Sequence, residues 1–311
     1  MKPGNRSTVT EFILLGLTHD PKLKVFLFLI LVAIYILTLV GNITILLIVY
    51  YSTQLQTPMY LFLTQLSFLD IILSTVFSPK TLVDLFSEKK TISFYGCLVQ
   101  LYFLGACTGT ESFLLAVMAF DRYVAICNPL LYNVTMTKGP CVCLVVGSYI
   151  SGFLHSLIHA AAVLWLSFCG PNVIDNFACD YPVLMKLSCI DFSFNELLRF
   201  VLVGFVVAIP LFIIFVSYFK IIIAILRIRT TAGRRRAAST CISHFTCVFL
   251  FYGSAFYLEV LPNKSSSQQQ YKALFLILTE FIPALNPLIY SLRNKEMQQA
   301  LRKTVPSISH T

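Results

Sequence analysis

Seven long apolar stretches, separated by short polar segments, organise this chain. They lie at about residues 25–50, 58–79, 97–120, 141–166, 199–226, 236–261 and 271–291. Each stretch is long enough to cross roughly 30 Å of hydrocarbon as an α-helix. The pattern therefore predicts an all-α membrane protein in which seven transmembrane helices form a bundle.

The composition agrees with a chain that lies mostly in lipid. Hydrophobic residues make up 57% of the sequence and charged residues 12%, whereas a soluble domain has about 25% charged residues. We expect one domain over residues 1–311, with an outer tail (1–24), a helix bundle with its loops (25–291) and an inner tail (292–311). The basic, amphipathic segment after Tyr290 predicts a short helix along the inner membrane surface.

The distribution of basic residues predicts the orientation. If the N-terminus lies outside, the inner side holds 12 basic residues and two acidic ones, Asp121 and Glu296, while the outer side is nearly balanced. The positive-inside rule therefore places the N-terminus outside and the C-terminus inside. The net charge of +9 does not indicate nucleic acid, because a basic cluster beside a span is typical of contact with lipid headgroups. The inner basic residues are Arg122, Lys138, Lys220, Arg227, Arg229, Arg234, Arg235, Arg236, Arg293, Lys295, Arg302 and Lys303.

Four cysteines fall on the outer side, where disulfides form. Cys97 precedes the third span, and Cys169, Cys179 and Cys189 lie in the long loop 167–198. Four cysteines allow three pairings. A long, cross-linked loop is expected to act as a lid over an outer cavity. Of the four glycosylation sequons, Asn5 is the expected glycan site, because Asn42, Asn133 and Asn263 fall in lipid, inside, or close to the membrane.

An acidic and a basic residue, Asp121 and Arg122, stand at the end of the third span. Cys97 to Phe120 contains a single acidic or basic residue, Glu111, and Asp121-Arg122-Tyr123 follows directly. Because ions are costly in lipid, charged residues at the end of a membrane helix usually mark function.

The seventh span carries the motif Pro283-Ala-Leu-Asn-Pro-Leu-Ile-Tyr290. Pro287 removes one helix hydrogen bond and permits a bend. We expect Asn286 to satisfy the freed backbone group and Tyr290 to carry a mobile polar tip. In isolation the motif would indicate only a tolerated kink.

Polar residues recur at one depth of the predicted bundle. Asp70 and Glu111 lie in the second and third spans, and Asn42 and Asn286 in the first and seventh. Oxygen ligands suit a hard cation, so one interpretation is an ion site formed by Asp70, Glu111 and Asn286, with sodium as its occupant. A polar network filled with water is an equal alternative.

The sequence does not favour metal catalysis or any other enzyme activity. His155 and His159 share one helix face, but Ser156 stands where a His-Glu-x-x-His zinc motif needs Glu. Packing or ligand contact is the preferred role for these two histidines. The stretch from Ala273 to Leu292 contains no lysine that could bind a retinal, and we find no nucleophile with an evident base. No metal and no cofactor beyond the candidate sodium ion is expected.

Taken together, these motifs resemble the vertebrate odorant receptors, a branch of the class A G-protein-coupled receptors. The resemblance covers nearly the whole chain. It is carried by Thr10 to Leu17, Gly41-Asn42, Thr57 to Leu63, Leu66 to Asp70, Met118 to Pro129, Ser217-Tyr218, Arg236 to His244, Phe251-Tyr252-Gly253 and Pro283 to Glu296.

The resemblance implies a function and the residues that carry it. The protein would bind small volatile molecules, activate a heterotrimeric stimulatory G protein of the olfactory type, raise cyclic AMP, and reside in the plasma membrane of olfactory cilia. It implies the disulfides Cys97–Cys179 and Cys169–Cys189. Arg122 would separate from Asp121 and meet the G protein. The residues implied in coupling are Asp121, Arg122, Tyr123, Tyr218, His244, Asn286, Pro287 and Tyr290.

The same placement predicts a ligand pocket between the outer halves of the third, fifth and sixth helices. A mostly apolar lining suits a small organic ligand. The expected lining residues are Leu104, Gly105, Thr108, Leu202, Val206, Tyr252, Ala255, Phe256 and Glu259, with Glu280 of the seventh span nearby.

Several residues depart from the family pattern. Glu259 stands where Tyr is usual, and Glu280 where an apolar or small residue is usual, which favours the hypothesis of a polar or amine ligand. The alternative is that one carboxyl is protonated or bonded to His155, His159 or water. Tyr149 replaces a Trp of the fourth helix, and in the outer loop the resemblance predicts His and Phe where Asn176 and Ala178 stand.

Two other functions remain alternatives. A transporter or channel would require matched repeats and a polar path across the membrane, and the sequence has no matched half-repeat. The same receptor mechanism used outside olfactory tissue is the second alternative.

Overall fold

The computed structural model describes residues 9–169, 171–189, 192–260, 268–293 and 295–308. Within them, seven helices are long and apolar enough to cross a membrane, which confirms the predicted bundle. Six are continuous, and the seventh is made of two α-helices joined by a π-helical turn. The spans are α1 (Pro21–Tyr51), α2 (Pro58–Phe86), α3 (Phe94–Cys127), α5 (Lys138–Leu164), α7 (Phe192–Arg227), α8 (Thr231–Val260), and α9 (Gln268–Leu276) with η3 (Ile277–Phe281) and α10 (Ile282–Arg293).

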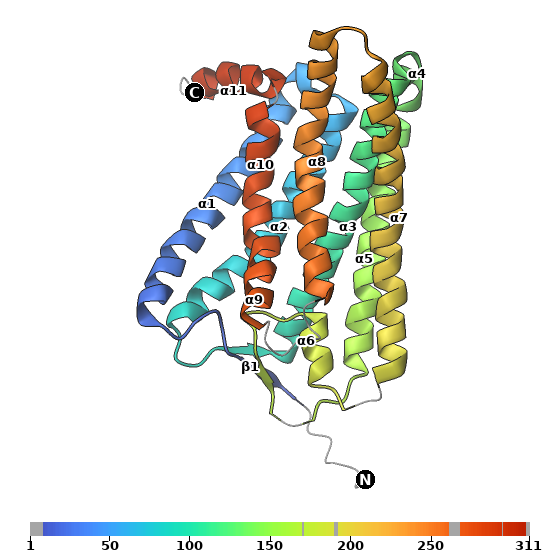
Figure 1. Cartoon of the computed structure of the whole chain (residues 1–311). Helices are drawn as coiled ribbons and strands as arrows, with labels where there is room; N and C mark the ends of the chain where they lie inside the picture. The colour runs from blue at the N-terminus through green and yellow to red at the C-terminus, as the bar shows by residue number, and fades with distance from the viewer. Residues whose placement is uncertain (1–8, 170, 190–191, 261–267, 294, 309–311) are drawn as a thin grey trace.

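The two ends of the bundle differ in their short elements, as Figure 1 shows. The N-terminal end carries three strands and the helix α6 (Tyr181–Lys186). The opposite end carries η1 (Thr53–Leu55), α4 (Pro129–Thr135) and α11 (Lys295–Ile308), which lies across the bundle axis. Met297 and Ala300 of α11 are buried while Leu301 and Arg302 are exposed, so this is the predicted short helix after the seventh span.

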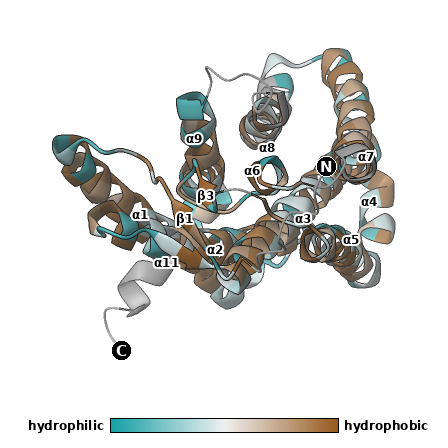
Figure 2. Cartoon of the chain, turned by 90° about the horizontal axis from the view of Figure 1, so that it is seen from below, coloured by the Kyte–Doolittle hydropathy of each residue, from teal (hydrophilic) through white to brown (hydrophobic). Residues whose placement is uncertain are grey.

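Figure 2 shows that the spanning helices are mostly hydrophobic along their length, and many of their large apolar side chains face outward. Leu29, Phe212 and Phe249 are each more than 60% exposed. In water such faces would associate, but lipid chains are as apolar as these side chains. Polar groups such as Asn42, Asp70 and Asn286 lie buried between the helices instead. The hydropathy pattern is therefore that of a protein solvated by lipid.

Two prolines inside helices, Pro210 and Pro287, leave backbone carbonyls that other helices satisfy. Pro210 cannot donate to the carbonyl of Val206, which accepts from the Ser112 hydroxyl of α3 at 2.7 Å. Pro287 likewise frees the carbonyl of Pro283, which accepts from Asn42 of α1 at 3.0 Å.

The expectation that Asn286 would satisfy the backbone freed by Pro287 was wrong. Its side-chain amide donates instead to Asp70 of α2. Asn42, not Asn286, donates to the backbone carbonyl that Pro287 leaves free, because Asn42 faces the seventh helix at the level of Pro283.

A three-stranded sheet, which the sequence did not predict, covers the outer end. Its strand order is β2-β1-β3, with β1 (Glu11–Leu14) antiparallel to β2 (Thr91–Ser93) and parallel to β3 (Val173–Ile174). Side chains alternate between the two faces of β1, so Phe12 and Leu14 are buried. The Phe12 ring packs edge-on against that of Phe168, with ring centroids 5.4 Å apart. The N-terminal tail is thereby joined to the long outer loop.

Two disulfides cross-link that loop. Cys97, in the first turn of α3, is bonded to Cys179, and Cys169 is bonded to Cys189, as the resemblance implied. The first of these bonds holds α6 and the residues before it against the end of the bundle. The loop thus closes over the outer end of the helices, as expected for a lid.

Candidate functional site

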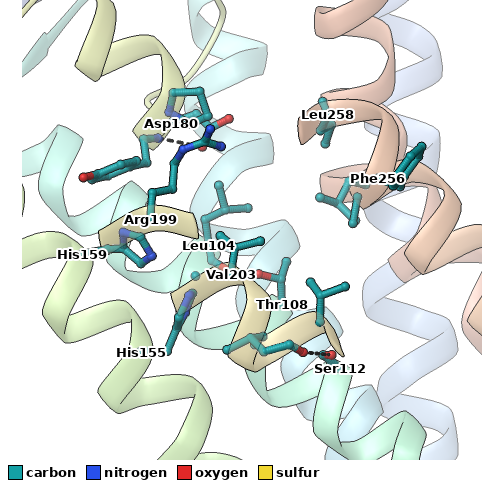
Figure 3. A pocket seen from close by; sticks show the side chains of 18 of the residues that line it. Leu104, Thr108, Ser112, His155, His159, Asp180, Arg199, Val203, Phe256 and Leu258 are labelled. Carbon is teal, nitrogen blue, oxygen red and sulfur yellow. Dashed lines mark hydrogen bonds between the residues drawn. The ribbon is translucent and has the colours of Figure 1, made fainter. Parts of the chain in front are cut away.

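A cavity of about 450 Å³ lies in the outer half of the bundle. Its walls come from α3, α5, α7, α8, α9 and η3, and Asp180 with the first residues of α6, Tyr181 and Pro182, contributes to its lining. Figure 3 shows His155 and His159 on one wall and Phe256 and Leu258 on the wall opposite. A concave, mostly apolar space of this size is typical of a small-molecule site.

Most of the residues predicted to line a ligand pocket lie on this cavity. Leu202 and Glu280 are not among its lining residues, and the side chain of Glu259 lies outside the described residues. The predicted residues that do line it are Leu104, Gly105, Thr108, Val206, Tyr252, Ala255 and Phe256. Their contact with a ligand stays a prediction.

Glu280 lies away from the cavity, against α2. It is 0% exposed, and its Oε2 atom accepts a short hydrogen bond from the Ser78 hydroxyl. Glu280 is part of the π-helical turn η3, which ends just before Pro283. The wider turn changes the direction of the following side chains relative to a regular helix, so a regular helical projection from the sequence misplaced this carboxyl. The amine hypothesis therefore loses one of its two acids.

The cavity also has polar lining residues that the sequence analysis did not include. Ser112 lies one turn beyond Thr108 on α3, so the helical period alone was enough to find it. Asp180, Tyr181 and Arg199 come from the outer loop and the outer end of α7. No periodicity in the sequence brings these loop residues to the bundle axis, so only the tertiary structure reveals them.

The floor of the cavity is a hydrogen-bonded contact between three helices. The Ser112 hydroxyl donates to the Val206 carbonyl and lies 2.7 Å from the Tyr252 hydroxyl. Since Ser112 has one hydroxyl hydrogen, Tyr252 is the donor between them, and it also reaches the Ser112 carbonyl at 3.2 Å. The floor therefore joins α3, α7 and α8 directly beneath the ligand space.

A second contact joins the same helices nearer the inner end. The Nε2 atom of His244 lies 3.0 Å from the Leu115 carbonyl, and its Nδ1 atom lies 2.6 Å from the Tyr218 hydroxyl. The carbonyl can only accept, so Nε2 carries the hydrogen, and in the neutral ring Nδ1 accepts from Tyr218. Tyr290 of α10 is also buried.

At the inner end of α3, the Asp121 carboxylate contacts Arg122 and Tyr132. Arg122 Nε lies 3.8 Å from Asp121 Oδ2, and the Tyr132 hydroxyl of α4 donates to Asp121 Oδ1 at 2.9 Å. Burial, with the negative charge of Asp121, raises the pKa of Tyr132, so that hydroxyl keeps its proton and remains a donor. Beside them, Lys220 lies over the Tyr123 ring at 5.0 Å.

The polar residues predicted for an ion site meet in the middle of the bundle. Asn286 donates to both carboxylate oxygens of Asp70 at 3.2 and 3.1 Å. Glu111 of α3 is buried close to Asp70. These oxygen atoms would suit a hard cation. The choice between a sodium ion and a water network stays a prediction.

The remaining departures from the family pattern have simple structural roles. Tyr149, in place of Trp, donates to Gln65 of α2 at 3.3 Å and packs beside Phe153. Asn176 and Ala178, within the lid, are both fully buried, and Asn176 Oδ1 accepts from the Phe177 backbone N–H. Asn5, the expected glycan site, lies outside the described residues.

Seven spanning helices, an outer cavity under a disulfide-linked lid, and an Asp-Arg pair at the inner end of the third helix define a seven-helix membrane receptor. A sequence profile described as olfactory receptor matches residues 31–307. Mouse (Mus musculus) olfactory receptor 5M5 is 50% identical over 305 residues, covering 98% of this chain and 96% of that protein. Mouse olfactory receptor 5G9 is 48% identical over 305 residues (98% and 97%), and human (Homo sapiens) olfactory receptor 5I1 is 46% identical over 303 residues (97% and 96%).

The chain belongs to the olfactory receptor family. It is therefore a multi-pass membrane protein of the G-protein-coupled receptor class and not an enzyme. Membership of this family decides against the transporter and channel alternative.

Proposed function

We propose that this receptor binds small volatile organic molecules in the outer cavity and activates a heterotrimeric stimulatory G protein of the olfactory type, raising cyclic AMP. One observation supports this most strongly. The cavity floor, Ser112 with Tyr252, and the inner contact, Leu115 with His244, join the same two helices, α3 and α8. A change at the floor therefore has a direct mechanical route to the inner end.

The mechanism rests on a shift between two arrangements of α3 and α8. A ligand shifts such an equilibrium only by binding one arrangement more tightly. Tyr252, Ala255 and Phe256 of α8 line the cavity, so a ligand there contacts the helix that must move. When α8 moves, His244 leaves Leu115 and Tyr218, and Arg122 separates from Asp121 to meet the G protein.

The remaining coupling residues act around this movement. Tyr123, Asn286, Pro287 and Tyr290 adjust the inner ends of α3 and α10, and the basic inner residues lie against lipid headgroups. The proposed location is the plasma membrane of olfactory cilia. The same mechanism would operate in another tissue that supplies the G protein.

The test is cyclic AMP production in cells that express the receptor with and without an olfactory-type G protein. The panel contains alcohols, aldehydes, ketones, esters, acids and amines. We expect at least one class to raise cyclic AMP only when the G protein is present. Surface staining confirms that the receptor reaches the membrane.

A pair of variants connects the response to the cavity. Val203→Phe fills part of the cavity, whereas Val201→Phe adds the same bulk on the exposed face of α7. We expect about a tenfold or greater loss of potency in the first and little change in the second. Silence across the panel at normal surface level, or equal effects of the two variants, would contradict the proposal.

A further inference from the structure

One wall of the cavity carries a cluster of neutral polar side chains. The His155 and His159 rings, on successive turns of α5, have centroids 4.6 Å apart. The ring of Tyr181, from α6, lies 4.7 Å from that of His159. All three residues line the cavity. Figure 3 shows the two histidines facing across it toward the wall of Phe256 and Leu258.

Several polar atoms of this cluster have no partner within the described part of the chain. Both ring nitrogens of His155, Nδ1 of His159 and the hydroxyl of Tyr181 are buried without a hydrogen bond to any residue that the structure describes. An unpaired buried polar group costs about 1–3 kcal/mol. A ligand group that pairs with these atoms would recover part of that cost, so the cluster points to a polar ligand group at this end of the cavity.

The charges nearby disfavour an ionised ligand. Among the cavity residues that the structure describes, those with a full charge are Asp180 and Arg199, and they point toward one another (Figure 3). Because these two opposite charges face and offset one another, an added carboxylate or ammonium group would be desolvated without gaining an opposite charge of its own. A neutral group avoids that desolvation cost.

The hydrogen-bonding capacity of the imidazole rings favours one kind of neutral ligand group, a hydroxyl. A neutral imidazole offers one N–H donor and one bare nitrogen acceptor. A hydroxyl group both donates and accepts, whereas a ketone, an aldehyde or an ether only accepts. A hydroxyl can therefore pair with both kinds of nitrogen in the histidine pair.

We propose that His155 and His159 bind the hydroxyl group of a neutral alcohol or phenol, whose hydrocarbon part lies against Leu104, Val203 and Phe256. This inference rests on the proposed function and names its ligand class. It differs from the amine hypothesis, one of whose two acids, Glu280, lies against α2 and not on the cavity.

The test measures binding directly on purified full-length receptor. Ligand-dependent rises in melting temperature give relative dissociation constants. The probes share a hexyl or a phenethyl skeleton and differ only in the terminal group: alcohol, methyl ether, aldehyde, carboxylic acid or amine. We expect the alcohols to bind about tenfold more tightly than the matched ethers. Equal binding of alcohol and ether, or tighter binding of the acid or amine, would overturn the proposal.

Substitutions of His155 and His159 test whether these residues cause the preference for alcohols over ethers. His159→Phe keeps a ring to pack against Tyr181 but removes both nitrogens, and His155→Phe does the same one turn away. Losing one hydrogen bond should raise the dissociation constant of the alcohol about three- to tenfold. The dissociation constant of the ether should rise less, because its oxygen can only accept from an imidazole N–H. His19→Phe, on the exposed outer tail, is the matched control. An alcohol preference that survives in both cavity variants would overturn the proposal.

The binding readout separates this inference from the proposed function. If alcohols bind with the expected selectivity but never raise cyclic AMP with an olfactory-type G protein, the proposed function fails and this inference stands. If another class raises cyclic AMP and alcohols do not bind, the inference fails and the proposed function stands. The ligand series on the unmodified receptor tests the inference even where a histidine variant does not fold.

Discussion

Tyr252 of α8 donates its hydroxyl hydrogen to Ser112 of α3, at 2.7 Å from the hydroxyl and 3.2 Å from the backbone carbonyl. The same Ser112 hydroxyl satisfies the carbonyl that Pro210 leaves unpaired in α7. One small side chain thus joins three helices at the floor of the cavity. In our account this contact holds α8 against α3 when no ligand is bound.

Tyr252→Phe should raise cyclic AMP in the absence of ligand. The variant keeps the ring but loses the bond to α3, and one net hydrogen bond contributes about 1 kcal/mol. The ratio of active to inactive receptor should therefore rise about fivefold, which basal cyclic AMP per surface receptor measures. Tyr257→Phe removes a hydroxyl from an exposed ring of the same helix and should leave the basal level unchanged. Equal basal levels in both variants would count against the role of this contact.

Glu280→Gln should leave the ranking of ligands unchanged. Glu280 bonds Ser78 of α2 and does not line the cavity, and Gln keeps an oxygen that can accept from Ser78. Dose–response curves for the alcohol, acid and amine of one skeleton would measure the ranking. A selective loss of amine responses would return Glu280 to the ligand site and contradict the structure.

Asn42→Leu should destabilise the bundle. Asn42 is the partner of the Pro283 carbonyl, which has no helical N–H because of Pro287. Hydrogen bonds between membrane helices contribute about 0.6 to 2 kcal/mol each, so thermal unfolding of purified receptor should begin at a lower temperature. Asn133→Leu, at an exposed position of α4, is the control. An unchanged melting temperature in Asn42→Leu would show that the freed carbonyl finds another partner.

Cys97→Ser should lower the fraction of receptor that reaches the cell surface. The bond to Cys179 holds the lid on α3 across 82 residues of sequence, and removing a disulfide typically costs about 2–5 kcal/mol. Surface staining divided by total receptor measures the effect. Cys143→Ser replaces an exposed free cysteine and should behave as the parent chain. Normal surface levels of Cys97→Ser would mean that the lid folds without this bond.

The features that follow from local pattern were predictable from the sequence. Apolar runs predicted the spans because crossing lipid sets both the length and the hydropathy of a helix. The family resemblance placed Leu104, Gly105 and Thr108 at the pocket, and the regular helix brings all three to one cavity because they share one side of it. Tyr252 and Phe256 follow from the same reasoning on α8.

The features that depend on irregular backbone or on partners far along the chain were not predictable. The π-helical turn η3 directs Glu280 toward Ser78, and a regular helical projection cannot anticipate it. Asn42 and Asn286 are both buried amides, and only the packed bundle decides which one reaches Pro283. Asp180 and Tyr181 reach the cavity because a disulfide and a small sheet hold the outer loop in place.

The central claim is that a ligand in the cavity activates the G protein through Arg122. The most direct measurement is ligand-stimulated cyclic AMP in Arg122→Ala at matched surface level, with Arg227→Ala, an exposed arginine at the inner end of α7, as control. We predict that Arg122→Ala loses the response while its ligand-dependent rise in melting temperature remains, and that Arg227→Ala keeps most of the response. A full cyclic AMP response in Arg122→Ala would contradict the account.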